Sequence, residues 1–469
     1  MLQVVKTDKG YVSGTIIGEP EKQAAIFRGI PYAAPPVGEL RWQPPQPNAP
    51  WEGIRECTQY SAISPQATIP GMTSPFPMSE NCLYLNVVTP AKKPHEKLPV
   101  MVWMHGGGYF MGCGNDKIWN QHRLPQFGVV VVTITHRLGP FGLVAHPALT
   151  KESPNNASGN YLFLDLIAAL KWVQKNIAAF GGDPGNVTIF GESGGGAKVS
   201  IMMCSPLAKG LFHRAICESG TATAISPGFP LAKMEEHGKT LFEKLGATTL
   251  EEARRVPWEK IIEVSETMSI QDKNVGTLKL PPWDAAFEGW VLQDSPDKLF
   301  QSSNINTVPL IVMATYGEVT NVPPLVMPFV IPAYIKMIES VNKNGRKGYA
   351  CIFDQVPAVW RREGFGSAHS TELTYVFGDW DNSSGWWQGI GMMAKATGAK
   401  SEVPVLDATD REISEAMMGY WTSFAKTGKP QYKGLPEWPE YLSAKDNYMY
   451  LNLKPQMREG FSKFGYPVP

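Results

Sequence analysis

The sequence lacks the features that mark several classes of protein. No apolar run reaches the ~18 residues that a membrane-spanning helix needs, and the charged N-terminus has no apolar segment of the kind found in signal peptides. The 43 acidic residues balance the 43 basic ones, so we expect no basic face for nucleic acid. Six cysteines in 469 residues form neither a disulfide framework nor a zinc pattern. We therefore expect a cytoplasmic protein with reduced thiols that binds neither membrane nor nucleic acid.

Apolar runs of strand length recur along the chain, and no repeat or linker separates them. Short alternating patterns come first, at residues 4–17 and 24–28. Longer runs follow at residues 100–104, 129–135, 187–190, 215–217, 310–314 and 350–353. Continuous apolar strands are typical of a parallel sheet that is covered on both faces. We therefore expect one α/β domain over residues 1–469, with a central, mostly parallel sheet flanked by helices.

The segments between these runs indicate helices. Residues 164–177 place their apolar side chains largely on one stripe, and the turn Gly181-Gly182-Asp183-Pro184 is expected to end that helix. Strand, helix and strand in this order form a βαβ crossover. Residues from about 225 to 345 alternate less regularly and contain several prolines, so we expect helical insertions there, covering one end of the sheet.

The sequence Gly191-Glu192-Ser193-Gly194-Gly195 follows the apolar run at 187–190. This is the G-x-S-x-G pattern of a nucleophilic serine at a sharp turn from strand to helix, where a side chain at either glycine would crowd the serine. The N-terminus of the following helix favours the negative charge that develops during acyl transfer. We therefore predict that Ser193 is a nucleophile.

A second glycine loop, His105-Gly106-Gly107-Gly108, follows the apolar run at 100–104. The backbone N–H groups of such H-G-G-G loops face the tetrahedral intermediate of ester hydrolysis. We expect Gly107 and Gly108 to donate one hydrogen bond each to the oxyanion, and Gly194 to donate the third.

Chain order selects the base, because triads on such a sheet run serine, acid, histidine. Three of the eight histidines follow Ser193. His213 leads into an apolar strand and is interpreted as structural, and His237 lies in a charged helical stretch and is interpreted as solvated. His369 lies in a glycine- and serine-rich loop after the strand at 350–353, where catalytic residues are common, so we predict that it is the base.

The acid must then lie between Ser193 and His369. Many carboxylates compete in this interval, and placement at a strand end selects Glu318, which follows the run at 310–314 after a short turn. Its predicted role is to accept the imidazole N–H and to stabilise the imidazolium.

These motifs belong to a wider pattern that resembles the type B carboxylesterases, the family that includes the cholinesterases. The similarity spans nearly the whole chain. The residues that carry it are 27–33, 35–38 with Arg41, 79–87, the loop at 105–108, 137–139, 181–184, the serine motif, Ala368-His369 with Glu372-Leu373, 376–378, Trp421 and Phe424. The resemblance implies an α/β-hydrolase fold. It also implies that Glu318 is the triad acid, that Arg41 and Glu80 form a buried ion pair, and that Glu192 and Ser219 lie beside the site.

The sequence departs from the family at several positions. Gly194 stands where the family often has alanine, which leaves the backbone donor unaffected. Cys82 is present, but Ser64 occupies the position of its usual disulfide partner, and Cys57 lies farther upstream. Met72 stands where cholinesterases have a tryptophan that holds choline by cation–π attraction, which argues against choline esters.

Together these features predict a carboxylic ester hydrolase that acts on small to medium neutral esters through an acyl-enzyme. This mechanism needs no cofactor and no metal. The expected partner is a small-molecule ester, and we expect a monomer or a weak homo-oligomer. Two alternatives stay open: an acyltransferase or amidase that uses the same site, and a non-catalytic binding relative, against which an intact Ser, Glu and His set argues.

Overall fold

The structure of the chain is a computed structural model. The structure describes residues 1–68, 75–268, 274–275, 278–279, 281–320, 327–382, 384–396 and 406–465. Met72, the position that bears on choline esters, lies outside these residues.

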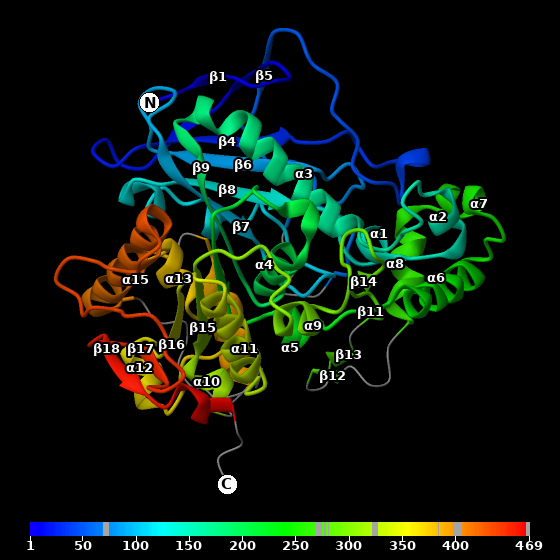
Figure 1. The fold of residues 1–469 in the computed structure, drawn as a ribbon. Coiled ribbons are helices and arrows are strands. Elements are labelled where there is room, and N and C mark those ends of the chain that lie inside the picture. The colour runs from blue at the N-terminus through cyan, green and yellow to red at the C-terminus, as the bar shows by residue number, and fades with distance from the viewer. Residues whose placement is uncertain are drawn as a thin grey trace.

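An 11-stranded mixed sheet forms the centre of the molecule (Figure 1). The strands in spatial order are β18 (Gln456–Glu459), β17 (Asn447–Leu451), β16 (Gly348–Phe353), β15 (Leu310–Thr315), β10 (Arg214–Glu218), β9 (Gly182–Glu192), β7 (Leu98–Met104), β8 (Val130–Thr135), β6 (Tyr84–Thr89), β4 (Ala24–Pro31) and β3 (Thr15–Ile17). The strands from β17 to β8 all run parallel to their neighbours. The predicted parallel sheet is therefore confirmed, and its six apolar runs are its central strands.

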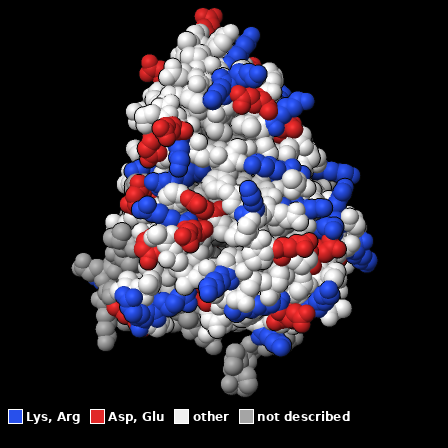
Figure 2. All heavy atoms as spheres, turned by 90° about the vertical axis from the view of Figure 1, so that its left-hand side faces the viewer, with Lys and Arg blue, Asp and Glu red and all other residues white. Residues whose placement is uncertain are grey.

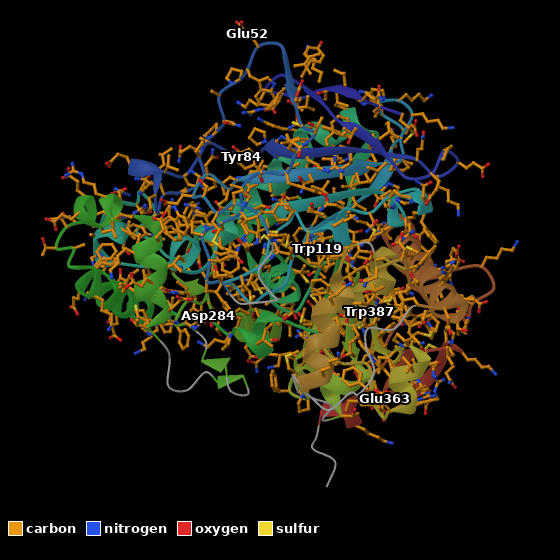
Figure 3. All side chains as sticks on the ribbon, turned by 180° about the vertical axis from the view of Figure 1, so that it is seen from behind. Glu52, Tyr84, Trp119, Asp284, Glu363 and Trp387 are labelled. Atoms are coloured by element: carbon orange, nitrogen blue, oxygen red, sulfur yellow. The ribbon has the colours of Figure 1, made fainter. Side chains whose placement is uncertain are left out.

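Helices cover both faces of this sheet, as the apolar strands predicted. Strand β7 shows the reason, because Val100 and Val102 pack into one core while Met101 and Trp103 pack into the other. The first core is shared with α3 (Tyr161–Asn176), α4 (Gly194–Cys204) and α11 (Val330–Lys343). The second is shared with α12 (Ala358–Arg362), α13 (Leu373–Phe377), α14 (Trp386–Ala396) and α15 (Ala408–Thr427). Figure 3 shows Trp119 and Trp387 on the half of the molecule that these later helices build.

The helix expected at 164–177 is α3, which begins three residues earlier, at Tyr161. The turn expected after it is only partly correct. Gly181 does turn the chain, with φ of +86°, but Gly182 already belongs to β9 because it pairs with Leu98 of β7. Backbone pairing across the sheet therefore extends β9 five residues ahead of its apolar run.

Smaller helices gather beside the sheet in the region from about 225 to 345. They are α6 (Leu231–Leu245), α7 (Leu250–Arg255), α8 (Trp258–Glu266), α9 (Pro296–Gln301) and α10 (Tyr316–Val319). The short helix α5 (Ala222–Ile225) directly precedes the region, and α11, which packs on the sheet, also lies within it. Figure 1 shows α6, α7 and α8 side by side with α1 (Gly139–Leu143) and α2 (Pro147–Glu152), away from the far edge strands β17 and β18. The same region contributes β15 to the central sheet, so it is not insertion throughout.

Short strands and 3-10 turns complete the fold. A three-stranded sheet joins β1 (Val4–Lys6), β2 (Tyr11–Ser13) and β5 (Ile54–Glu56), and two-stranded pairs join β11 (Phe229–Pro230) to β14 (Ala286–Phe287) and β12 (Asn274–Val275) to β13 (Leu278–Lys279). The 3-10 turns span Gly38–Leu40, Lys117–Asn120, Leu124–Phe127, Ile177–Phe180, Pro206–Ala208 and Phe461–Gly465. On the face shown in Figure 2, basic and acidic side chains are interspersed, as the balanced composition predicts.

This topology brings the predicted functional residues to one edge of the sheet. Strands β7, β9, β10, β15 and β16 are consecutive neighbours and run in the same direction. The glycine loop follows β7, Ser193 follows β9, Glu318 follows β15 and His369 follows β16. Ligands of open α/β sheets bind outside the carboxyl ends of the strands, so this edge is the place to look for a site.

Candidate active site

Ser193 occupies a strained turn between β9 and α4. Its φ of 56° and ψ of −122° lie outside the regions that non-glycine residues favour. The turn is held by a 2.8 Å hydrogen bond from the Ser193 N–H to the carbonyl of Glu218 in β10. Glycines allow the close approach: a Cβ at Gly191 or Gly195 would lie 2.5 or 2.0 Å from the carbonyl oxygen of Met104. Ser193 is partly exposed, so a substrate can reach it.

The glycine loop after β7 lies directly against the start of α4. Gly107 and Gly108 have φ of +80° and +61°, which favours glycine at both positions. A Cβ on Gly194 would lie 2.2 Å from the carbonyl oxygen of Gly108, so these two backbones touch. Among the described residues, none of the three N–H groups of Gly107, Gly108 and Gly194 donates a hydrogen bond. All three predicted donors are therefore together and available to an acceptor.

His369 and Glu318 are brought into contact from two different strand ends. Nδ1 of His369 lies 2.6 Å from Oε2 of Glu318, and the Glu318 side chain is fully buried. The other oxygen, Oε1, accepts a 2.9 Å hydrogen bond from the Thr315 N–H, because Glu318 is the third residue of the short helix α10 and closes a capping box. The carboxylate is thus fixed before it meets the imidazole.

The opposite nitrogen of the imidazole faces a carboxylate that the motifs alone did not place. Nε2 of His369 lies 3.1 Å from Oε1 of Glu192, which also accepts a 2.7 Å hydrogen bond from Ser370. Within the described part of the chain, His369 makes no hydrogen bond to Ser193. Burial lowers the pKa of the His369 imidazole, but the charges of Glu192 and Glu318 outweigh it and raise this pKa to about 9.

Two more buried carboxylates, those of Glu218 and Glu372, lie near His369 and its two acidic partners. Burial raises the pKa of Glu218 to about 8, although the indole N–H of Trp421 donates a 2.7 Å hydrogen bond to it. Burial and the neighbouring acids raise the pKa of Glu372 well above its ordinary value, and the Ser219 hydroxyl lies 3.5 Å from its Oε1. Glu192 and Ser219 therefore do lie beside the candidate site. Glu218 carried no motif signal, since it ends an ordinary apolar strand.

Aromatic side chains support the loop that carries His369. The indole N–H of Trp386 in α14 donates a 3.3 Å hydrogen bond to the carbonyl of Ser370, and Trp386 packs on Trp119 with ring centroids 5.5 Å apart. The labelled Trp119 in Figure 3 marks this part of the molecule, whereas Asp284 marks the side where the smaller helices lie. The second core thus fixes the position of the histidine loop.

The other histidines behave differently from His369. His213 accepts a 3.1 Å hydrogen bond from the Val187 N–H, a structural role as predicted. His237 is half-buried in α6, with its ring 6.3 Å from that of Phe229, so the prediction of a solvated side chain is wrong. The apolar face of α6 turns it inward, which its charged sequence neighbours did not indicate.

The buried ion pair implied by the family resemblance is present. Nε of Arg41 lies 2.7 Å from Oε2 of Glu80, and the guanidinium also donates to the carbonyls of Ala253 and Val256 at the end of α7. All six cysteines are buried, and Cys57 and Cys82 are free thiols. In the described ranges no three His, Cys, Asp or Glu side chains are grouped to hold a metal ion, and no helix is long and apolar enough to cross a membrane.

Comparison with known proteins gives a consistent result along the chain. The sequence profile of the carboxylesterase family matches residues 2–332 and 326–465. A duck (Anas platyrhynchos) protein named fatty acyl-CoA hydrolase precursor, medium chain, is 33% identical over 96% of this chain and 88% of its own length. The para-nitrobenzyl esterase of Bacillus subtilis (strain 168) is 32% identical, covering 94% of this chain and 92% of its own. A solved structure of a thermophilic PNB esterase superposes with a TM-score of 0.82, at 28% identity, over 99% of this chain and 100% of that one.

Proposed function

The chain belongs to the carboxylesterase family, has its α/β-hydrolase fold and hydrolyses carboxylic esters, and we propose that Ser193 is the nucleophile, His369 the general base and Glu318 the acid of its triad. The observation that carries this proposal is the 2.6 Å contact between Glu318 and His369 at the strand edge where the strained Ser193 turn also lies. Glu318 would hold the imidazole in the tautomer whose Nε2 can accept a proton.

The first half of the proposed reaction acylates the enzyme. Ser193 Oγ bonds to the ester carbonyl carbon while its proton passes to Nε2 of His369, and the π electrons of the carbonyl move onto oxygen. The N–H groups of Gly107, Gly108 and Gly194 receive this oxyanion. The tetrahedral intermediate then collapses, and His369 returns the proton to the leaving alcohol.

The second half repeats these steps with water. His369 removes a proton from water as the oxygen attacks the acyl carbon, and Ser193 leaves with the proton that the imidazole gives back. In both halves Nε2 must turn from Glu192 toward Ser193 or water. The 3.1 Å ion pair between Glu192 and His369 therefore represents the resting arrangement in this proposal.

We propose small to medium neutral esters as the substrate class, because the sequence has Met72 in place of the choline-binding tryptophan. Among the relatives, the name para-nitrobenzyl esterase describes an ester of an uncharged alcohol and agrees with this class, and the name medium-chain fatty acyl-CoA hydrolase agrees with it only in the length of the acyl group. A series of p-nitrophenyl esters of increasing acyl length tests this range. A higher kcat/KM for butyrylcholine than for a matched neutral butyrate would argue against it.

Labelling tests the nucleophile directly. A fluorophosphonate should react with the wild-type enzyme in step with loss of esterase activity, and the labelled peptide should contain Ser193. Ser193→Ala should fold normally, take no label and lose about 10³-fold or more in kcat. A label on a peptide elsewhere in the chain, or an active Ser193→Ala variant, would refute the assignment.

We further propose that the enzyme works in the cytoplasm, a reducing compartment. The support is that Cys57 and Cys82 are free and buried, and that burial raises the pKa of Cys57 to about 12 and that of Cys82 further still. Melting the protein with and without a strong reductant tests this, because loss of a disulfide would lower Tm by several degrees. An unchanged Tm is expected. A drop under reduction, or a Cys57–Cys82 peptide in a mass spectrum, would contradict the proposal.

A further inference from the structure

A buried lysine lies beneath the candidate oxyanion hole, and the proposed mechanism does not use it. Lys198 is fully buried in α4, and its Nζ donates a 2.8 Å hydrogen bond to the carbonyl of His105. His105 is the residue from which the loop of Gly106, Gly107 and Gly108 departs. Within the described residues, no carboxylate pairs with this amine.

The position of Lys198 links two parts of the site. Gly194 and Lys198 are four residues apart on α4 and therefore share one face of the helix. Gly195, three residues before Lys198, packs so closely on the end of β7 that a Cβ on it would lie 2.0 Å from the carbonyl oxygen of Met104. The hydrogen bond from Lys198 to His105 extends this contact. It therefore links the helix that carries the Gly194 N–H to the loop that carries the N–H groups of Gly107 and Gly108.

Burying an amine in this way costs stability. A lysine that loses its hydration and gains one carbonyl partner is less favourable than an apolar side chain of the same length. Burial lowers the pKa of the Lys198 amine to about 7. The titratable groups that face it, His105 and His136, have their pKa values lowered well below the ordinary range, by burial first and then by the charge of Lys198, so both are neutral.

We infer that Lys198 is a positioning residue of the oxyanion hole, whose protonated amine holds the His105 carbonyl and places positive charge behind the developing oxyanion. This inference rests on the proposed function. An anion that forms nearby favours the protonated amine, so the lysine acts most strongly in the transition state. A group that costs folding stability and strengthens only the transition state is expected in an active site.

Two variants separate the charge from the hydrogen bond. Lys198→Met removes both and keeps the length of the side chain, while Lys198→Gln keeps a neutral donor. Lys171→Met, which removes an exposed lysine from α3, is the matched control. Each is assayed with an alkyl trifluoromethyl ketone and with the corresponding methyl ketone. The fluorinated ketone accepts Ser193 Oγ at its carbonyl carbon, its π electrons form an oxyanion and the serine proton moves to His369, whereas the methyl ketone binds largely without this bond.

We expect Lys198→Met to lower kcat about tenfold with little change in KM. The same substitution should lower the affinity for the trifluoromethyl ketone by the same factor and leave the affinity for the methyl ketone unchanged. Lys198→Gln should show a smaller loss of kcat and of affinity for the trifluoromethyl ketone, and Lys171→Met should match the wild type in both. The Tm of Lys198→Met should equal or exceed that of the wild type at neutral pH. Unchanged affinity of Lys198→Met for the trifluoromethyl ketone, or an equal loss for both ketones, would overturn the inference.

A measurement on the wild-type enzyme covers the case in which the variants do not fold. The carbon-13 resonance of one lysine ε-carbon should titrate near neutral pH and move to higher pH when the trifluoromethyl ketone is bound. If the pKa of this lysine were the same with and without the trifluoromethyl ketone, the inference would be overturned. Failure of the proposed function looks different, because the wild type itself would then bind the two ketones alike and phosphonate would not label Ser193.

Discussion

Nε2 of His369 and Oε1 of Glu192 lie 3.1 Å apart, on the side of the imidazole that the proposed reaction needs for Ser193. Glu192 immediately precedes the nucleophile in the chain, so the turn that exposes the serine also carries this carboxylate to the base. The imidazole thus lies between two acids, since Glu318 contacts Nδ1. This arrangement stabilises imidazolium, which helps the transition state but lowers the fraction of free base.

Glu192→Gln should therefore shift the pH profile. His369 acts as a base only when unprotonated, so kcat/KM falls as the pH drops through the imidazole pKa, which the two acids raise to about 9. Removing the Glu192 charge lowers that pKa, and the acidic limb of the profile should move to lower pH. The measurement is kcat/KM for one neutral ester across the neutral and alkaline range.

Glu372→Gln is the matched control for this shift. Its carboxyl is also buried near the site, but burial and the neighbouring acids raise its pKa well above the ordinary value, and it is not among the groups that raise the pKa of His369. The profile of Glu372→Gln should follow that of the wild type. A Glu192→Gln profile with an unmoved acidic limb would show that Glu192 does not set the pKa of the base.

Glu318→Gln should lower kcat by about 10²–10⁴-fold with a small effect on KM. The amide keeps the volume of the buried side chain but cannot stabilise the imidazolium, so the loss falls on the transition state. Steady-state kinetics of the purified variant measure it, with circular dichroism to confirm the fold. Near wild-type kcat would mean that another carboxylate orients His369.

Gly194→Ala should lower kcat by about tenfold, although alanine is common at this position in the family that the sequence resembles. In this chain the added methyl would lie 2.2 Å from the carbonyl oxygen of Gly108, and a backbone atom must move to admit it. Gly185→Ala is the control, because that methyl meets only the tip of the Asp183 side chain, at 3.2 Å. Equal activity of Gly194→Ala and wild type would mean that the glycine loop stands farther from α4 in solution.

Arg41→Met should destabilise the fold by about 3–5 kcal/mol, because it leaves the Glu80 carboxylate buried without its partner. Chemical denaturation gives the free energy of unfolding. Arg255→Met breaks an ion pair with Glu251 whose side chains are 75% and 65% exposed, and it should cost less than about 1 kcal/mol. Similar losses of unfolding free energy in the two variants would show that the buried ion pair contributes no more to stability than the exposed one.

The sequence predicted the parts of this molecule whose signal is local. Apolar runs identified the six central strands, and each glycine motif identified a sharp turn, because period and turn chemistry are properties of neighbouring residues. Strand β17 was missed, since its alternation of tyrosine and methionine became a strand only by pairing with β16. The start of β9 was missed for the same reason.

The environment of the site was harder to foresee, because it is created by tertiary contacts. Nothing near Glu192 in the sequence indicates that its carboxylate reaches a histidine 177 positions later. Lys198 has the sequence neighbours of an ordinary helical lysine, and only the approach of α4 to β7 buries it. The assignment of His369 succeeded by elimination among a few candidates, whereas no such elimination was possible for the surrounding acids.

The pair of carboxylates around His369 also bears on how the pocket empties. Hydrolysis of an ester yields an acid that ionises at neutral pH and an alcohol that stays neutral. Once the acid has ionised, its carboxylate faces Glu192 and Glu318, two negative charges of which the resting imidazolium of His369 offsets only one. Like charges at short range repel, so the acid leaves readily while the alcohol feels no such force. Accumulated acid should therefore inhibit turnover only weakly.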